Sequence, residues 1–296
     1  MSGNREYKSD VFSMLMQDKE RALQLYNAMN GSSYDNPEDV EMVIHDGGIS
    51  LSVRNDASFI VDARLSIYEH QSTVCPNMPV RSLIYFSVIL SDMLSDKKKG
   101  TKSGKNIYGR RLVKIPTPHF VVFYNGEEEQ PEVQELKLSD AFEVHEEDPQ
   151  LELKVTVLNI NEGMNEELKS RCPVLKEYME YVGAVRRNME HMPLDEAVDA
   201  AIEYCIKNNI LKDFLLEQKA EVKKMSIYEF DEEREMEMIR QDERAEGEQL
   251  GREQAVLSLC RKFGCSHEES IQRLMEECSL TREEAEKRVE EYRSED

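Results

Sequence analysis

Apolar and polar positions alternate with two different periods along the chain. From residue 9 to residue 29 the apolar residues recur every three or four positions, which predicts one amphipathic helix capped by Ser9 or Asp10. Between residues 40 and 71 they alternate at about every second position, interrupted by "DGG" and "VDAR", which predicts three antiparallel strands. A second helix is expected over residues 80–94, and the almost continuous apolar run "HFVVFYN" predicts a central, buried strand.

The second half of the chain has a different pattern. The stretch "GEEEQPEVQ" indicates a solvated acidic loop, "LELKVTVLNIN" predicts one more strand, and from about residue 166 the pattern is helical. Residues 229–254 are too polar on all sides for a core helix. Two short helices are expected near the end, each with the first and fourth residues of a capping box: Ser266 with Glu269, and Thr281 with Glu284.

The order helix, three strands, helix, strand predicts an α/β fold. We expect a core over residues 1–162 and a helical extension packed on it over residues 163–228. A charged helix or linker is expected over residues 229–254, followed over residues 255–296 by a small helical hairpin for self-association or partner contact.

Composition limits the location of the protein. No run of about 18 apolar residues is present, so no membrane span is expected. The polar first ten residues lack the apolar segment of a secretory signal, and the six cysteines are scattered without a disulfide framework. These features predict a cytoplasmic protein with reduced thiols.

The net charge of −22 is unevenly distributed. Residues 1–126 hold 15 Lys and Arg against 14 Asp and Glu, whereas residues 127–296 hold 23 against 46. Within the first half, residues 81–115 hold nine basic residues and two acidic ones. A basic patch beside an acidic pair can hold phosphates while the acids hold a metal, and a solvated loop is the alternative.

The predicted β-hairpin carries a pair of acids. A two-residue turn at Asp62 and Ala63 places Asp56 opposite Glu69, with Gln71 on the same face as Glu69. Opposed carboxylates repel each other, and a divalent cation between them removes that cost. Mg²⁺ needs only one or two carboxylates besides water and phosphate oxygens, so the pair predicts a site for Mg²⁺ or Mn²⁺. Surface acids on the rim of a hairpin are the alternative.

Five stretches carry a family resemblance: "NDASFIVDARLSIYEHQSTVCPNMPVRSLIYF", "KIPTPHFVVFYNG", "LSDAF", "NINEGMN" and "AIEYCIKNNILKDFL". They resemble the Rpn family of recombination-promoting nucleases, also called transposase-like proteins, of the PD-(D/E)XK superfamily. The resemblance covers roughly residues 5–250. It implies a restriction-endonuclease-like core followed by an α-helical C-terminal region, and a Mg²⁺-dependent DNA endonuclease linked to recombination or mobile elements.

The same resemblance assigns roles to residues of the hairpin. Asp56 matches the acid of the second core strand and Glu69 that of the third, and the metal would also bind the backbone carbonyl of His70. Gln71 stands where the superfamily usually has Lys and would orient the attacking water. Asp10 resembles an acid that reaches the metal through water, with a helix N-cap as its alternative. The His70 side chain alternates to the opposite face, which indicates a core or surface residue rather than a base.

Basic residues supply the expected contacts with DNA. Arg81 and Tyr85 are one helical turn apart and share a face. Arg81 is expected to hold a phosphate, and a salt bridge to an acid of the site is the alternative. Non-specific, salt-sensitive affinity is expected from the following basic residues: Lys97, Lys98, Lys99, Lys102, Lys105, Arg110 and Arg111.

Three functions follow from these features. The first is a DNA endonuclease, expected to be a homodimer because a double-strand cutter with one site per chain needs two chains. It would need no organic cofactor and would associate with the bacterial nucleoid when bound to DNA. The second is a nuclease-fold protein with weak or no catalysis that binds DNA or regulates a partner. The third, an assembly scaffold built on the acidic helices, accounts for the tail but not for the carboxylate pair.

Overall fold

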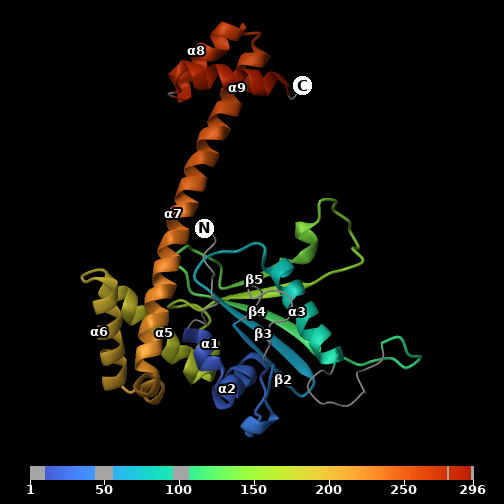
Figure 1. The fold of residues 1–296 in the computed structure, drawn as a ribbon, viewed down its shortest axis with the longest axis vertical. Coiled ribbons are helices and arrows are strands. Elements are labelled where there is room, and N and C mark those ends of the chain that lie inside the picture. The colour runs from blue at the N-terminus through green and yellow to red at the C-terminus, as the bar shows by residue number, and fades with distance from the viewer. Residues whose placement is uncertain (1–10, 44–55, 96–106, 279, 295–296) are drawn as a thin grey trace. The chain divides into compact units, whose positions relative to one another are not determined.

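The chain folds as an α/β protein around a mixed six-stranded sheet (Figure 1). The structure is a computed structural model that describes residues 11–43, 56–95, 107–278 and 280–294. The chain divides into two compact units, residues 1–233 and residues 234–296, and the sheet belongs to the first. Within the described ranges, no helix is both long enough and apolar enough to cross a lipid bilayer.

The sheet has the strand order β1-β2-β3-β4-β6-β5. Strands β1, β2 and β3 are antiparallel neighbours, as predicted, whereas β3, β4 and β6 run parallel and β5 is antiparallel to β6. The strands are β1 (Glu41–Met42), β2 (Ala57–Val61), β3 (Arg64–Gln71), β4 (Thr117–Tyr124), β5 (Val133–Lys137) and β6 (Lys154–Asn159).

The turn between β2 and β3 has the predicted two residues. Asp62 and Ala63 have φ values of 47° and 59°, the left-handed values that a type I′ hairpin turn requires. The Tyr34 hydroxyl donates to Asp62 Oδ2 at 3.1 Å and helps to hold this turn. Ala57 pairs with Tyr68, so the register predicted for the hairpin is confirmed.

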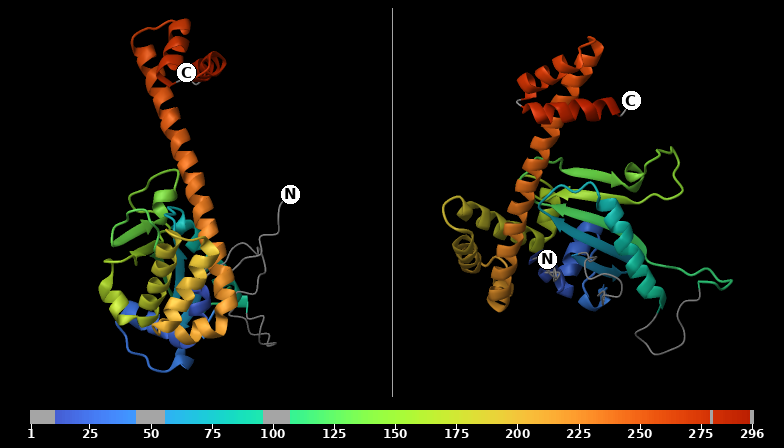
Figure 2. Two further views of the ribbon diagram at one scale, coloured as in Figure 1. Left: turned by 90° about the vertical axis from the view of Figure 1, so that its left-hand side faces the viewer. Right: turned by 45° about the horizontal axis from the view of Figure 1, so that its top comes forward.

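Helices cover both faces of the sheet (Figures 1 and 2). Helix α3 (Met78–Ser95) packs on one face, where Leu65, Ile67 and Val122 are buried. The other face carries Phe59, Tyr68 and Phe123. It is covered by α1 (Val11–Met16), α2 (Lys19–Asn30), α5 (Pro173–Met189) and the first part of α7 (Lys212–Lys262), and α6 (Leu194–Lys207) packs on α5.

Burial on both faces explains the composition of β4. Phe120 and Val122 belong to the core under α3, whereas Val121 and Phe123 belong to the core on the other side. A strand that is covered on both faces needs apolar residues at consecutive positions rather than at alternate ones. The prediction of a central, buried strand is therefore confirmed.

Two predicted elements were wrong. The first helix is two helices, because Asp18 is extended (φ −79°, ψ 122°) and caps α2 by accepting a hydrogen bond from the backbone N–H of Arg21. The acidic stretch predicted as a loop contains part of β5, an edge strand in which exposed and half-buried residues alternate. The helical pattern beyond residue 166 begins with α4 (Glu166–Arg171).

The charged segment 229–254 is helical throughout, because α7 runs from Lys212 to Lys262. In the second unit the end of α7, α8 (His267–Cys278) and α9 (Arg282–Ser294) form a separate small core. Both predicted capping boxes are present: Ser266 N donates to Glu269 Oε2 at 2.7 Å, and Thr281 N donates to Glu284 Oε2 at 2.9 Å.

Candidate functional site

Asp56 stands immediately before β2 and is held from two sides. Its backbone carbonyl accepts a hydrogen bond of 2.8 Å from the hydroxyl of Ser13, a buried residue of α1. Its side-chain Oδ2 accepts a hydrogen bond of 2.6 Å from the backbone N–H of His70 on β3. The hairpin register, extended by one pair beyond Ala57 and Tyr68, places Asp56 opposite Glu69.

Glu69 is a buried carboxylate on the α3 face of the sheet. Glu69 is 4% exposed, and its Oε2 accepts a hydrogen bond of 3.1 Å from Arg81 Nη2. A buried carboxylate costs several kcal/mol unless a charge or hydrogen bonds compensate it. Arg81, whose side chain is 40% exposed, supplies that charge from the second turn of α3. The salt bridge given above as the alternative for Arg81 is therefore present.

Tyr85 completes this cluster. Arg81 donates to the Tyr85 hydroxyl from Nε at 3.0 Å and from Nη2 at 2.8 Å, so the two residues share a face of the helix as predicted. Burial raises the pKa of Tyr85, and the charges of Glu69 and Asp56 raise it further. Burial lowers the pKa of Arg81, but the charge of Glu69 and the contact with Tyr85 raise it more, so its guanidinium stays protonated.

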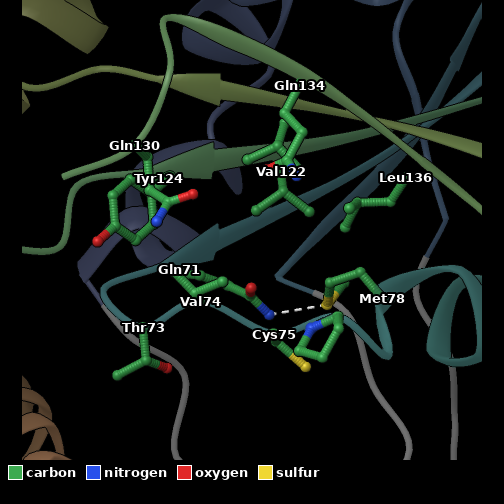
Figure 3. Close-up of a pocket in the computed structure, with 12 residues that line it drawn as sticks. Gln71, Thr73, Val74, Cys75, Met78, Val122, Tyr124, Gln130, Gln134 and Leu136 are labelled. Carbon is green, nitrogen blue, oxygen red and sulfur yellow. Dashed lines mark hydrogen bonds between the residues drawn. The ribbon is translucent and has the colours of Figure 1, made fainter. Parts of the chain in front are cut away.

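Gln71 lies on the same face as Glu69, two residues further along β3. Its amide nitrogen donates to Met78 Sδ at 2.8 Å, and its side chain forms part of a pocket wall (Figure 3). A thioether sulfur is a weak acceptor. The amide predicted to orient a water therefore rests on the first turn of α3.

The His70 side chain points to the opposite face of the sheet from Glu69. It is stacked on Phe12 with 5.7 Å between ring centroids, and its Nε2 lies 3.3 Å from the Tyr178 hydroxyl. Its Nδ1 lies 3.6 Å from Glu229 Oε1. His70 is thus a core residue, as expected from strand alternation, and ligation of a metal by its backbone carbonyl stays a prediction.

Several predicted residues lie outside the described part of the chain: Asp10, Lys97, Lys98, Lys99, Lys102 and Lys105. Arg110 and Arg111 are described, and both are exposed. Two neighbours of these arginines, Tyr108 and Leu112, are 93% and 89% exposed. Sequence analysis did not single out these two residues, which stand beside the basic ones in the run "IYGRRLVKI".

The segment 107–116 joins the sheet at the end away from the carboxylates. Its last residue precedes Thr117, whose N–H donates to Ala63 O at the β2–β3 turn, 2.9 Å away. Glu69 pairs with Val122, five residues further along β4. At about 3.3 Å per residue, these positions are roughly 17 Å apart along the strand. The segment that carries Arg110 and Arg111 therefore enters β4 at one end, and Glu69 lies beside the other end of that strand.

The carboxylates suit one kind of metal ion. Among the described residues no group of three or more His, Cys, Asp and Glu side chains is placed to hold a metal. Asp56 and Glu69 provide two carboxylates at facing positions of a hairpin. Mg²⁺ is commonly held by one or two carboxylates and completes its octahedron with water and substrate phosphates. The donor set therefore fits Mg²⁺ or Mn²⁺ bound together with a phosphate ligand, and does not fit an ion caged by protein alone.

No protein-family model, no curated protein and no solved structure matches the chain. The chain is an α/β protein with a mixed sheet and with carboxylates at facing positions of a hairpin, one of which, Glu69, is paired with Arg81 of the covering helix.

Proposed function

We propose that this chain is a metal-dependent DNA endonuclease with a PD-(D/E)XK core. One observation carries the proposal. The Asp56 carboxylate accepts a hydrogen bond from the backbone N–H of His70, the residue next to Glu69 on β3, and Arg81 donates to the Glu69 carboxylate. The resemblance of the hairpin sequence to the recombination-promoting nucleases supports it and suggests a role in recombination or in mobile elements.

Each side chain of the site has a task in this proposal. Asp56 and Glu69 would hold Mg²⁺ or Mn²⁺, an ion that supplies Lewis acidity and an activated water at a phosphodiester. Arg81 would exchange its bond to Glu69 for a phosphate oxygen, since a guanidinium binds carboxylate and phosphate with the same geometry. Gln71 would leave the weak acceptor Met78 and orient the attacking water.

The exposed segment 107–116 would hold the duplex beside the cut. Its distance of roughly 17 Å along β4 from the position of Glu69 corresponds to about five base pairs of B-DNA. Arg110 and Arg111 would contact phosphates there, and Tyr108 and Leu112 would contact sugars or bases. A homodimer in the cytoplasm, nucleoid-associated when bound to DNA, would allow cleavage of both strands.

Cleavage of supercoiled plasmid tests the proposal. Purified protein is incubated with Mg²⁺ or Mn²⁺, with EDTA as the blank, beside Glu69→Gln and Asp56→Asn. The matched control is Glu135→Gln, which changes an exposed glutamate of β5 that pairs with Lys154. We expect metal-dependent nicking that falls at least about 100-fold in both site variants and is unchanged in the control. Cleavage that survives both site variants would place the chemistry elsewhere and refute the proposal.

A second function is favoured by the observed side-chain contacts. The guanidinium of Arg81 bonds to Glu69 and the amide of Gln71 bonds to Met78, so both polar groups are engaged inside the protein. A nuclease-fold protein that binds DNA with weak or no catalysis would keep these contacts when DNA is bound. Wild-type protein that retards DNA in a gel but does not nick it with either metal would favour this function.

A further inference from the structure

A pocket opens on the α3 face of the sheet next to the carboxylates (Figure 3). Its volume is about 440 Å³ when the space at its open mouth is counted. Strands β3, β4, β5 and β6 contribute to it, together with the segment from Thr73 to Met78 at the start of α3.

The pocket wall is uncharged. Apolar side chains form most of it, among them Val74, Met78, Val122, Leu136 and Val157. No Lys, Arg, Asp or Glu is among the described residues that line it. A wall of this kind favours a neutral, largely apolar group over a phosphate, because a bound anion would have no charged partner.

Glutamine amides provide the specific polar groups of the pocket. Gln71 enters from β3 and Gln134 from β5, and Gln130 lies in the connection before β5 (Figure 3). The side-chain nitrogen of Gln71 donates a hydrogen bond to the sulfur of Met78. In the described part of the chain, no side chain or backbone group is hydrogen-bonded to the side-chain amide of Gln134. An amide offers a donor and an acceptor side by side, the pattern with which Gln pairs with the edge of a nucleobase.

The pocket adjoins the carboxylate site directly. Gln71 follows Glu69 by two residues on the same face of β3, a separation of roughly 7 Å. Met78 and Arg81 are three residues apart on α3 and therefore share a face of the helix. A ligand in the pocket would lie beside the ion pair of Glu69 and Arg81.

We propose that this pocket receives one nucleobase of the DNA strand whose phosphate lies at Asp56 and Glu69, and that Gln134 reads the edge of that base. This inference rests on the proposed nuclease function and deepens it. A base can enter such a pocket only when it is unstacked from its neighbours. The chain would therefore cut most readily next to a base that is unpaired or easily extruded.

Substrates with a single missing base test the proposal. A set of oligonucleotide duplexes is prepared, each with a single abasic residue at a different position near the mapped cut. For each duplex, kcat/KM is measured with the wild type and with Gln134→Leu. The matched control is Gln24→Leu on α2, a glutamine that is also half-buried but belongs to a helix on the other face of the sheet. We expect one abasic position to lower kcat/KM of the wild type and of the control at least about fivefold, and to have little effect on Gln134→Leu.

Two results would overturn the proposal: the same abasic effect in Gln134→Leu as in the wild type, or no effect at any position. Ligand-observed NMR with the four deoxynucleosides separates this failure from failure of the proposed function. Binding by the wild type and by Gln24→Leu, but not by Gln134→Leu, supports a base pocket even if the protein cuts no DNA. Cleavage of plasmid without binding of any nucleoside, together with insensitivity to abasic residues, leaves the nuclease standing and removes the pocket from it.

Discussion

Arg81 is the residue whose replacement tests the electrostatics of the site most directly. In the folded protein its guanidinium lies 3.1 Å from the carboxylate of Glu69, which is buried. Arg81→Met removes the charge and keeps much of the apolar stem, so that packing on α3 changes little. The change should therefore leave a buried carboxylate, facing Asp56, without its positive partner.

The cost can be estimated from the burial of the two partners. Breaking a fully buried ion pair by removing one member costs about 3–5 kcal/mol. The Glu69 side chain is 5% exposed but that of Arg81 is 40% exposed, so solvent screens part of the interaction. We expect the free energy of unfolding to fall by about 1–3 kcal/mol in the absence of divalent ions. Mg²⁺ should restore more stability to Arg81→Met than to the wild type, because it no longer competes with a guanidinium for Glu69.

Urea unfolding in EDTA and in Mg²⁺, followed by tyrosine fluorescence, gives both quantities. The set comprises the wild type, Arg81→Met, Glu69→Gln, the double variant and the control Arg111→Met, in which an exposed arginine is changed. Coupling between the two positions below about 0.5 kcal/mol would show that the ion pair contributes no stability. Equal stabilisation of wild type and Arg81→Met by Mg²⁺ would show that the guanidinium and the metal do not share Glu69.

Three further changes test other parts of the fold. A Cβ on Gly126 would lie 1.9 Å from the backbone oxygen of Ser72, so Gly126→Ala should lower the free energy of unfolding in urea by about 1–3 kcal/mol. Gly251→Ala in α7, where a Cβ has open space, should be neutral or slightly stabilising. Thr281→Ala removes the cap of α9 and should lower the Tm of residues 234–296 by roughly 4–8 °C. The Thr281 hydroxyl and N–H lower the pKa of Glu284, so this loss of Tm should shrink as the pH falls below 4.5, the ordinary pKa of a glutamate. A loss of Tm that does not depend on pH would contradict the capping. Burial raises the pKa of Cys172 to about 11, so alkylation followed by mass spectrometry at pH 8 should modify it no faster than the protein unfolds.

The hairpin was predictable because its register depends on local chemistry. Alternation of apolar residues fixes which face of each strand is buried, and a two-residue turn fixes the pairing. The sequence leaves open what the acids contact. Glu69 meets Arg81 because the connection after β3 returns α3 over the strand, and that path depends on packing of Met78 and Tyr85 rather than on spacing alone.

The errors also have local causes. Asp18 carries the signal of a helix start, but the apolar period continues on both sides of it and hides the break. Strand β5 has two apolar residues, of which Val133 is exposed and Leu136 is half-buried. The strand also follows an acidic run, so its alternation is weak against a loop signal. The pocket beside the carboxylates combines residues from four strands, and no short stretch of sequence announces it.

The start of α7 determines where the first unit can be cut from the rest of the chain. Val222 and Phe230 are buried in the core beside the sheet, and Glu229 lies against the ring of His70. A shortened protein that ended at residue 228, where the helical extension was expected to end, would lose Phe230 and Glu229 together. It would expose the core behind the strand that carries Glu69 and tend to aggregate. A chain ending at residue 233 keeps both contacts and is the better shortened protein for studying the sheet with its site.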